Sequence, residues 1–196
     1  MFLTKKIEQG IVRATVLHQG QTRKGSDVPY IIHPFAVAFL LAHYTDDEDV
    51  IIAGLLHDVL EDVATYTAED MRREFGERVL AIVTEVTEDF TLAEREDHTL
   101  RKDSWRMRKE KYLANLADDS HEALLVAAAD KIHNLRSLLD QYRLLGDTLP
   151  EPFNATSENL LWFYGEATRI IAERLKHPLA DELVKTFAET KKIIAL

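Results

Sequence analysis

Apolar residues recur along most of the chain at spacings of three and four, which is the period of an α-helix, and they seldom alternate with polar residues as they would in a strand. Glycine and proline are scarce, with seven and five residues respectively, so few positions break the pattern. The pattern predicts an all-α fold. Helices are expected over residues 5–19, 33–43, 49–62, 67–76, 77–86, 122–145, 156–175 and 179–193, with a further helix beginning at Trp105.

Two of these helices are apolar on nearly every side, which predicts that they lie inside the bundle. They cover residues 35–43 and 122–145. Polar segments mark the connections between helices: residues 20–29 are rich in turn-forming residues, and residues 87–103 are charge-dense and have no regular period. We expect the second of these segments to be a mobile loop.

Four ionisable residues stand in the otherwise apolar run of residues 53–63, namely His57, Asp58, Glu61 and Asp62. Burying them would cost several kcal/mol each unless something paired them. On one continuous helix, steps of one, three and four would bring all four side chains to the same side. A divalent metal ion is the natural partner for such a cluster.

Two more residues of the same kind lie in segments that we expect to be buried. Asp130 follows the apolar run of residues 124–129, and His33 opens another helix. Together with His57 and Asp58, they predict a metal site built from three helices. The chain has no cysteine, so the ligands are nitrogen and oxygen atoms, and Mn²⁺, Fe²⁺, Zn²⁺ and Mg²⁺ all suit such a set.

Glu61 and Asp62 come one helical turn after two of the proposed ligands, where either carboxylate could orient a metal-activated water or take its proton. The alternative is a helix-terminal pair that only hydrogen-bonds groups around the metal. Five other histidines lack acidic partners at metal-binding spacing, so we expect them on the surface or in packing: His18, His43, His98, His121 and His177.

The chain has 196 residues, enough for one domain with a substantial core. We expect a single domain over residues 1–196, with a core of about residues 5–145 and closing helices over about 156–193. The net charge of −10 argues against broad binding to nucleic acid or to anionic membranes. No apolar run approaches the ~18 residues of a membrane span, and the first residues lack the architecture of a signal peptide. We therefore expect a cytoplasmic protein that binds neither nucleic acid nor membrane. A small anionic molecule can still bind if a metal ion and local arginine or lysine residues reverse the sign of the charge at the site.

Four motifs follow one another along the chain. They are Arg23-Lys24, the segment from Pro29 to Pro34 with His33, the segment from Ala53 to Asp62, and the segment from Ala129 to Ser137 with Asp130 and Asn134. In this order they resemble the HD-domain phosphohydrolases, and within them the RelA/SpoT-type hydrolase domain and its free-standing small alarmone hydrolases. The resemblance covers about residues 5–145. It implies an HD-domain helical bundle, which here carries two additional C-terminal helices.

The resemblance also implies a chemistry. It implies a metal, usually manganese in this family, bound by His33, His57, Asp58 and Asp130. It assigns the attacking water to the acidic pair, Glu61 and Asp62. The implied substrate is of the (p)ppGpp kind, cut at its 3′-pyrophosphate to give GDP or GTP and pyrophosphate. The positions that hold the nucleotide in relatives are matched by Arg23, Lys24 and Asn134.

Several features leave alternatives open. Val63 stands where the family usually has threonine, and the loop over residues 24–29 is a residue longer than its commonest form. The residues that read the base are not located by the sequence, so the alternative function is hydrolysis of another phosphorylated nucleotide, such as NADPH, (p)ppApp or a nucleoside phosphate. A catalytically silent nucleotide-binding module is the third alternative.

The basic residues between positions 101 and 111 either extend a phosphate-binding surface or form a solvated helix face. About 50 residues follow the core, which is too few for a synthetase domain, so we expect a hydrolase without one. The sequence gives no indication of the oligomeric state.

Overall fold

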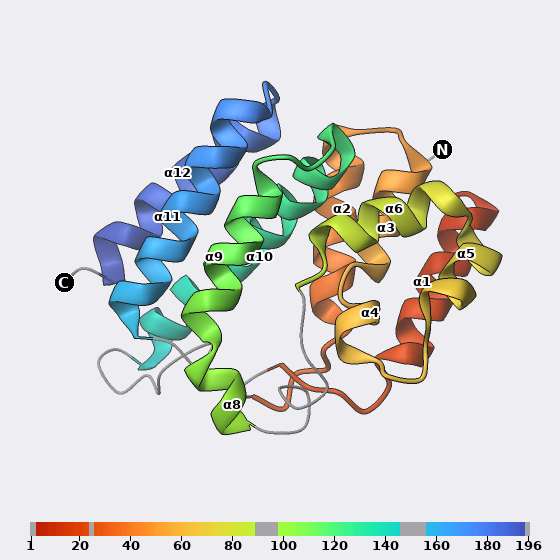
Figure 1. Ribbon diagram of the computed structural model, residues 1–196, viewed down its shortest axis with the longest axis horizontal. Helices are drawn as coiled ribbons and strands as arrows, with labels where there is room; N and C mark the ends of the chain where they lie inside the picture. The colour runs from red at the N-terminus through yellow and green to blue at the C-terminus, as the bar shows by residue number, and fades with distance from the viewer. Residues whose placement is uncertain (1–2, 24–25, 89–97, 146–155, 195–196) are drawn as a thin grey trace. The chain divides into compact units, whose positions relative to one another are not determined.

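The computed structural model describes residues 3–23, 26–88, 98–145 and 156–194, and within them the all-α prediction is confirmed (Figure 1). In this part of the chain, the only pairing of extended backbone is an isolated bridge between Thr22 and Pro29. The helices are, in chain order, α1 (Lys5–Leu17), α2 (Ile32–Tyr44), α3 (Glu48–Leu56), α4 (Val59–Asp62), α5 (Ala68–Phe75), α6 (Glu77–Val86), α8 (His98–Asp103), α9 (Trp105–Leu116), α10 (His121–Leu145), α11 (Ser157–Arg174) and α12 (Pro178–Ile194). None of these helices is both long enough and apolar enough to cross a membrane.

The chain divides into two compact units, and most residues are in contact mainly with residues of their own unit. The first comprises Met1–Thr87 with Asp119–Asp130, and the second comprises Glu88–Asp118 with Lys131–Leu196. The long helix α10 therefore begins in the first unit and ends in the second. The assignment of the whole chain to a single domain stays a prediction.

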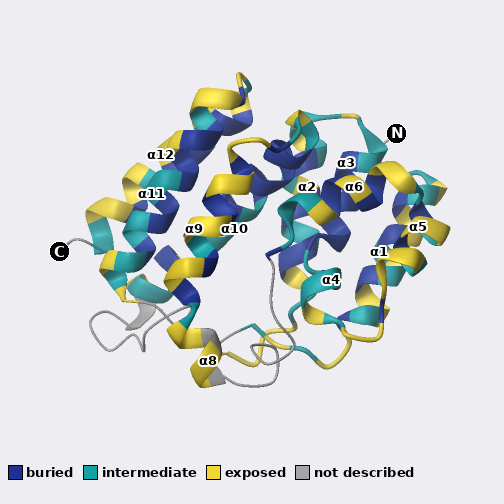
Figure 2. Ribbon diagram, viewed as in Figure 1, coloured by how far each residue is buried: buried dark blue, intermediate teal, exposed yellow. Residues whose placement is uncertain are grey.

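Helix α3 forms the centre of the first unit because its surface is apolar all round. Every residue from Val50 to Leu56 is buried, and α1, α2 and α6 all pack against this helix (Figure 2). The helix begins after Asp47, whose side chain accepts a hydrogen bond from the backbone N–H of Asp49. A buried helix of this kind gives the unit its core, since aliphatic side chains of its neighbours are removed from water against it.

Helices α2 and α3 approach closely at Gly54. A Cβ atom at this position would lie 2.4 Å from Cδ1 of Leu41 and 3.4 Å from Cγ1 of Val37, both on α2. The side chains of Leu41 and Val37 are completely buried. Glycine is therefore required for this packing, which holds together the two helices that carry His33 and His57.

The second unit is organised around aromatic residues. Helix α11 packs against α9 and α12. The rings of Trp105 and Tyr112 on α9 meet the ring of Phe163 on α11 edge to face, at centroid distances of 6.2 and 5.8 Å. All three rings are buried. The closing helices therefore pack into a core, to which α9 contributes aromatic rings.

A buried ion pair joins the beginning of the second unit to α9. Arg108 and Glu88 are both buried and bond to each other, and Lys109 donates to the second oxygen of the same carboxylate. The guanidinium of Arg106 lies over the ring of Trp162. The basic segment is therefore not a uniformly solvated face, because part of it binds a carboxylate and an aromatic ring within this unit.

Most predicted helix ends agree with the structure. Thr67 and Asp70 form a reciprocal capping box at the start of α5. Gly76 ends that helix with a φ of 92°, a left-handed conformation that glycine adopts without strain. Helix α6 covers the predicted residues, Glu77–Val86.

Two helix predictions are wrong. The helix expected over residues 49–62 ends at Leu56, and a separate short helix follows it. The loop expected over residues 87–103 is helical from His98, and this short helix packs against α9. Its residues include neither glycine nor proline, so no residue there disfavours a helix strongly. Their high charge was therefore not a reliable sign of a loop. Residues 89–97 lie outside the described part of the chain.

Arg78 on α6 connects three acidic residues of the first unit. Its guanidinium bonds to the carboxylate of Asp47 at 2.6 and 2.8 Å, to that of Asp49 at 3.2 Å and to that of Glu122 at 3.0 Å. These residues stand at the starts of α3 and α10. One side chain therefore links three helices at one end of the unit.

We expect Gly54→Ala to lower the free energy of unfolding by about 1 kcal/mol. Alanine is the better helix former by about 1 kcal/mol, but the added methyl group has to displace a completely buried Leu41 side chain, and such overpacking costs about 1–3 kcal/mol. Chemical denaturation measures the difference. Gly165→Ala is the matched control, because its Cβ would approach only the end of the Phe187 ring, at 3.2 Å. An unchanged or increased stability of Gly54→Ala would contradict this account of the helix packing.

Arg78→Ala is expected to destabilise the protein at neutral pH by about 1 kcal/mol, a modest amount because solvent screens the partly exposed ion pairs. Hydrogen bonds from Arg78 lower the pKa of Asp47 below its usual value. A carboxylate whose pKa is lowered stabilises the fold above its ordinary pKa and loses that effect as the pH falls. The difference between variant and parent should therefore shrink below about pH 4.

Urea denaturation at a series of pH values tests this expectation. Arg72→Ala is the control, since Arg72 pairs only with the exposed carboxylates of Glu69 and Glu77 among the described ion pairs. A stability difference that grew as the pH fell would show that the network acts in some other way.

Candidate metal centre

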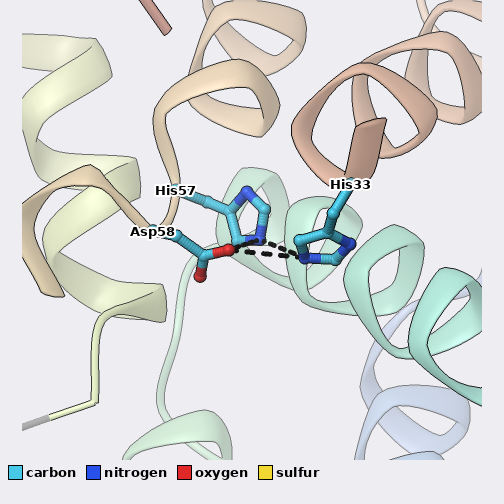
Figure 3. Close-up of side chains that lie close together, drawn as sticks. All are labelled: His33, His57 and Asp58. Carbon is cyan, nitrogen blue, oxygen red and sulfur yellow. Dashed lines mark hydrogen bonds and ion pairs between the residues drawn. The ribbon is translucent and has the colours of Figure 1, made fainter. Parts of the chain in front are cut away.

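The central side chains of the site come from the ends of three helices. His33 stands in the first turn of α2, next to Pro34, whose missing N–H does no harm there. His57 is the C-cap of α3, and Asp58 is the N-cap of α4. Figure 3 shows the two imidazoles and the carboxylate pointing toward one another from these elements.

Two ring nitrogens and one carboxylate oxygen converge on a small region. Nε2 of His33 lies 3.1 Å from Nε2 of His57 and 3.4 Å from Oδ2 of Asp58, and Nε2 of His57 lies 3.0 Å from the same oxygen. On α10, Oδ1 of Asp130 lies 3.2 Å from Nε2 of His33 and 3.7 Å from Nε2 of His57. The structure thus brings together the four residues that were predicted to bind a metal.

These distances suit one divalent cation. Ligand atoms at right angles around an ion with bonds of about 2.1 Å lie about 3 Å apart. His33, His57 and Asp58 each offer one atom within 4.8 Å of the other two, and imidazole nitrogens with carboxylate oxygens form a donor set for divalent metals. Both imidazoles are buried, whereas the side chains of Asp58 and Asp130 are 19% and 13% exposed. Solvent therefore reaches the site on the side of the carboxylates.

The electrostatics of the site call for positive charge. Burial by itself lowers the pKa of His57, but the Asp58 and Asp130 carboxylates outweigh it and hold the pKa of the imidazole well above its ordinary value. Burial raises the pKa of Asp58, while His57 and His33 have the larger combined effect and hold this pKa well below its usual range. The carboxylates thus favour a proton on His57, and a divalent cation would supply positive charge in place of that proton.

The prediction of one continuous helix through the cluster is wrong, because the backbone turns at His57. Nδ1 of His57 donates to the carbonyl oxygen of Gly54 at 2.9 Å, so the imidazole caps the last turn of α3 and its Nε2 faces the other ligands. The carbonyl of Asp58 then accepts hydrogen bonds from the N–H groups of Glu61 and Asp62 in α4. The four ionisable side chains therefore do not share one face of one helix.

The predicted acidic pair lies on α4, directly after Asp58. Glu61 is half-buried and Asp62 is exposed. The negative charge of Asp62 contributes to a raised pKa of Tyr30, so this carboxylate is within electrostatic reach of the Tyr30 hydroxyl. The roles of Glu61 and Asp62 toward an attacking water stay predictions.

The predicted nucleotide contacts lie on two different segments. Arg23 is in the loop before α2, and its guanidinium lies over the ring of Tyr30, 5.6 Å from the ring centroid. Lys24 lies outside the described residues. Asn134 is half-buried on α10, four residues after Asp130 and therefore one helical turn further along.

Two residues near the ligands were given no role by the sequence. The hydroxyl of Tyr30 donates to Oδ2 of Asp58 at 2.5 Å. The ring of His18, which is buried, packs against Tyr30 with 5.0 Å between the ring centroids. In the sequence, the only feature that could have indicated the contact between Tyr30 and Asp58 is the position of Tyr30 three residues before His33. His18 had been assigned to the surface or to packing, and packing is correct.

The sequence pattern of the HD domain matches residues 11–145. Among curated proteins, the chain is 40% identical over 124 residues to the guanosine-3′,5′-bis(diphosphate) 3′-pyrophosphohydrolase MESH1 of Xenopus tropicalis, an alignment that covers 62% of this chain and 63% of that protein. It is 36% identical over 135 residues to the bifunctional (p)ppGpp synthase/hydrolase SpoT of Escherichia coli, covering 68% of this chain. The aligned region is only 18% of SpoT, so the chain spans a small part of that relative.

Solved structures give the same picture of the fold. A metazoan ortholog of SpoT, described as hydrolysing ppGpp and playing a role in starvation responses, matches with a TM-score of 0.75 and 28% identity, over 96% of this chain and 97% of that one. The lmo0812 protein of Listeria monocytogenes matches with a TM-score of 0.69 and 27% identity, over 84% of this chain and 99% of that one. Because the HD-domain pattern covers residues 11–145, more than half of its length, this chain belongs to the HD-domain family.

Proposed function

We propose that this protein is a metal-dependent hydrolase that removes the 3′-pyrophosphate of (p)ppGpp. In this reaction one water is consumed, the bond between the ribose 3′ oxygen and phosphorus breaks, and GDP or GTP leaves together with pyrophosphate. A small phosphorylated nucleotide is the substrate class of the relatives named as pyrophosphohydrolases. Their similarity to this chain and the match to a ppGpp-hydrolysing ortholog of SpoT support the assignment.

The observation that carries the proposal is the convergence of two imidazoles and two carboxylates at distances that suit one cation. The nearest pairs of atoms are 3.0 to 3.4 Å apart, and they belong to His33, His57, Asp58 and Asp130. Buried ionisable groups are expensive unless they are paired, so a cluster of this kind indicates a functional site. A silent binding module would have no need to keep all four.

In this proposal the four residues hold a divalent cation, and Mn²⁺ is the ion that we assign. When bound, such an ion offsets the charge that develops on the phosphoryl oxygens and lowers the pKa of water toward neutrality. Asp58 is well suited to hold it, because the neighbouring imidazoles keep the pKa of this carboxyl well below its usual range. His57 presents Nε2 as a ligand because its other nitrogen donates to Gly54.

The acidic pair on α4 supplies the groups that act on water. Glu61 or Asp62 orients the attacking water and takes its proton, and both follow the ligand Asp58 within four residues. Half-burial of Glu61 and exposure of Asp62 make Glu61 the stronger candidate for the base, since its side chain is the one more shielded from bulk water. Both are acceptors only when ionised, so the activity should decline in acid.

We assign the binding of the nucleotide to the cationic and polar residues Arg23, Lys24 and Asn134. Arg23 is placed by the loop before α2, and a guanidinium can donate two hydrogen bonds to one phosphate. Lys24 adds a second cation, and Asn134 supplies an amide that can donate or accept at the base or ribose. The chain carries a net charge of −10, so local cations of this kind are needed for an anionic substrate.

We expect the purified protein to convert ppGpp with Mn²⁺ to GDP and pyrophosphate in equal amounts. Chelation should abolish the reaction, added Mn²⁺ should restore it, and His57→Ala should lose both bound metal and turnover because a ligand is missing. Chromatography of the nucleotides and a pyrophosphate assay measure the outcome. ppApp and NADPH, tested in parallel under the same conditions, distinguish the alternative substrates. Metal-loaded protein that left ppGpp intact would contradict the proposed function.

Glu61→Gln should retain the metal and lower kcat about 100-fold or more, because the amide has nearly the same shape as the carboxylate but cannot take a proton. Metal content by elemental analysis and steady-state kinetics separate the two effects. The matched control is Glu69→Gln, the same chemical change at an exposed residue that pairs with Arg72. If Glu61→Gln kept the full kcat, Asp62 would have to be the base, and Asp62→Asn would then show the loss.

A further inference from the structure

The hydroxyl of Tyr30 is directed at the oxygen on which the site converges. It donates to Oδ2 of Asp58 at 2.5 Å. The same oxygen lies 3.0 Å from Nε2 of His57 and 3.4 Å from Nε2 of His33. The hydrogen bond therefore acts on the atom that Asp58 offers to a metal, and a carboxylate oxygen has a second lone pair with which to accept it.

The ring of Tyr30 is held firmly by its neighbours. Its centroid lies 5.0 Å from that of His18 and 5.8 Å from that of His33, and the guanidinium of Arg23 lies over it. The backbone N–H of Tyr30 donates to the carbonyl of Gln21 at 2.9 Å. Because both the ring and the backbone are fixed, the hydroxyl has little freedom to leave Asp58.

His18 contributes to this support from inside the core. It is only 2% exposed, and its Nδ1 lies 2.7 Å from the side-chain oxygen of Gln21, to which it donates. Burial lowers the pKa of His18 below its ordinary value, which favours a neutral ring. A neutral, buried imidazole can pack against the face of Tyr30 without bringing a competing positive charge to the site.

An ionised carboxylate can only accept hydrogen bonds, so the hydroxyl of Tyr30 is the donor in its 2.5 Å contact with Oδ2 of Asp58. Its effect on Asp58 is therefore one of orientation.

We propose that Tyr30 is a positioning residue that orients the Asp58 carboxylate for the metal and, through its ring, sets the position of Arg23 for the nucleotide. The inference rests on the metal centre of the proposed function and deepens it. A carboxylate can rotate about its last bond, and a hydrogen bond from outside the metal's own ligands removes that freedom before the ion arrives. The hydroxyl and the ring of one side chain thus have separable tasks.

Tyr30→Phe and Tyr30→Leu separate these two tasks. Tyr30→Phe removes only the hydroxyl, so it should weaken the binding of Mn²⁺ alone about 10-fold and leave the KM for the nucleotide at saturating Mn²⁺ unchanged. Tyr30→Leu also removes the ring under Arg23, so it should weaken Mn²⁺ binding and raise this KM as well. Arg23→Ala should raise the KM without changing the affinity for Mn²⁺. Electron paramagnetic resonance of free Mn²⁺, in the absence of nucleotide, measures the metal affinity directly.

Tyr66→Phe is the matched control. Its hydroxyl bonds to the carboxylate of Glu74 at 3.5 Å in the same unit, away from the ligands, so its loss should leave Mn²⁺ affinity as in the parent. Raising the Mn²⁺ concentration should restore the turnover of Tyr30→Phe, a rescue that a purely structural defect would not show. Circular dichroism of the metal-free proteins reports whether each variant folds.

The outcomes distinguish a failure of the proposed metal centre from a failure of the role that we assign to Tyr30. A parent protein that bound no Mn²⁺ would overturn the metal centre itself. A parent that bound Mn²⁺ while Tyr30→Phe bound it within twofold as well would overturn only the role of Tyr30. A Tyr30→Phe chain that was unfolded without metal would also overturn it, because the hydroxyl would then support the fold and not the ligand.

Discussion

The candidate site depends on two carboxylates that lie close together beside the hydrophobic core. The carboxylates of Asp58 and Asp130 face two imidazoles beside a core of aliphatic side chains, where an unpaired charge is costly. These carboxylates have to be balanced by positive charge. The histidines can supply it by binding a proton, or they can stay neutral and bind a cation. The fold serves this requirement by placing His33, His57 and Asp58 at helix ends, where the backbone changes direction and several side chains can meet at one point. The chemistry of the site and the packing of α2, α3 and α10 are therefore parts of one arrangement.

Helical periodicity was sufficient to predict most of the helices. Apolar spacing of three and four predicts α6, and a threonine followed three residues later by an aspartate predicts the capping box at Thr67, because both signals are local in the sequence. The residues of the proposed metal centre were predictable for a different reason. An aspartate such as Asp130, standing directly after a buried apolar run, has few reasons to be there except a partner.

Contacts that depend on folding could not be predicted in the same way. The helix through His57 ends because its imidazole competes for the Gly54 carbonyl, and nothing in the spacing of apolar residues records that competition. Tyr30 and Asp58 are 28 residues apart, and their hydrogen bond follows from the packing of two helices. The charged neighbours of Arg108 in the sequence suggest a surface residue. In the structure Arg108 is buried, because it pairs with Glu88, which lies 20 residues earlier in the chain.

The burial of α3 from Val50 to Leu56 makes the segment that leads to His57 harder to open than the loop that carries Arg23. Amide hydrogens in a helix that is buried on every side exchange with solvent only when the whole unit opens, so His57 is anchored in its most persistent part. Arg23, by contrast, is carried by a loop whose following residues, 26–29, are exposed. Substitutions in that loop can change the residue that we assign to the nucleotide without disturbing the helix that leads to His57. The fold thus places the proposed substrate contact and the proposed metal centre on parts of the chain that differ in how easily they open.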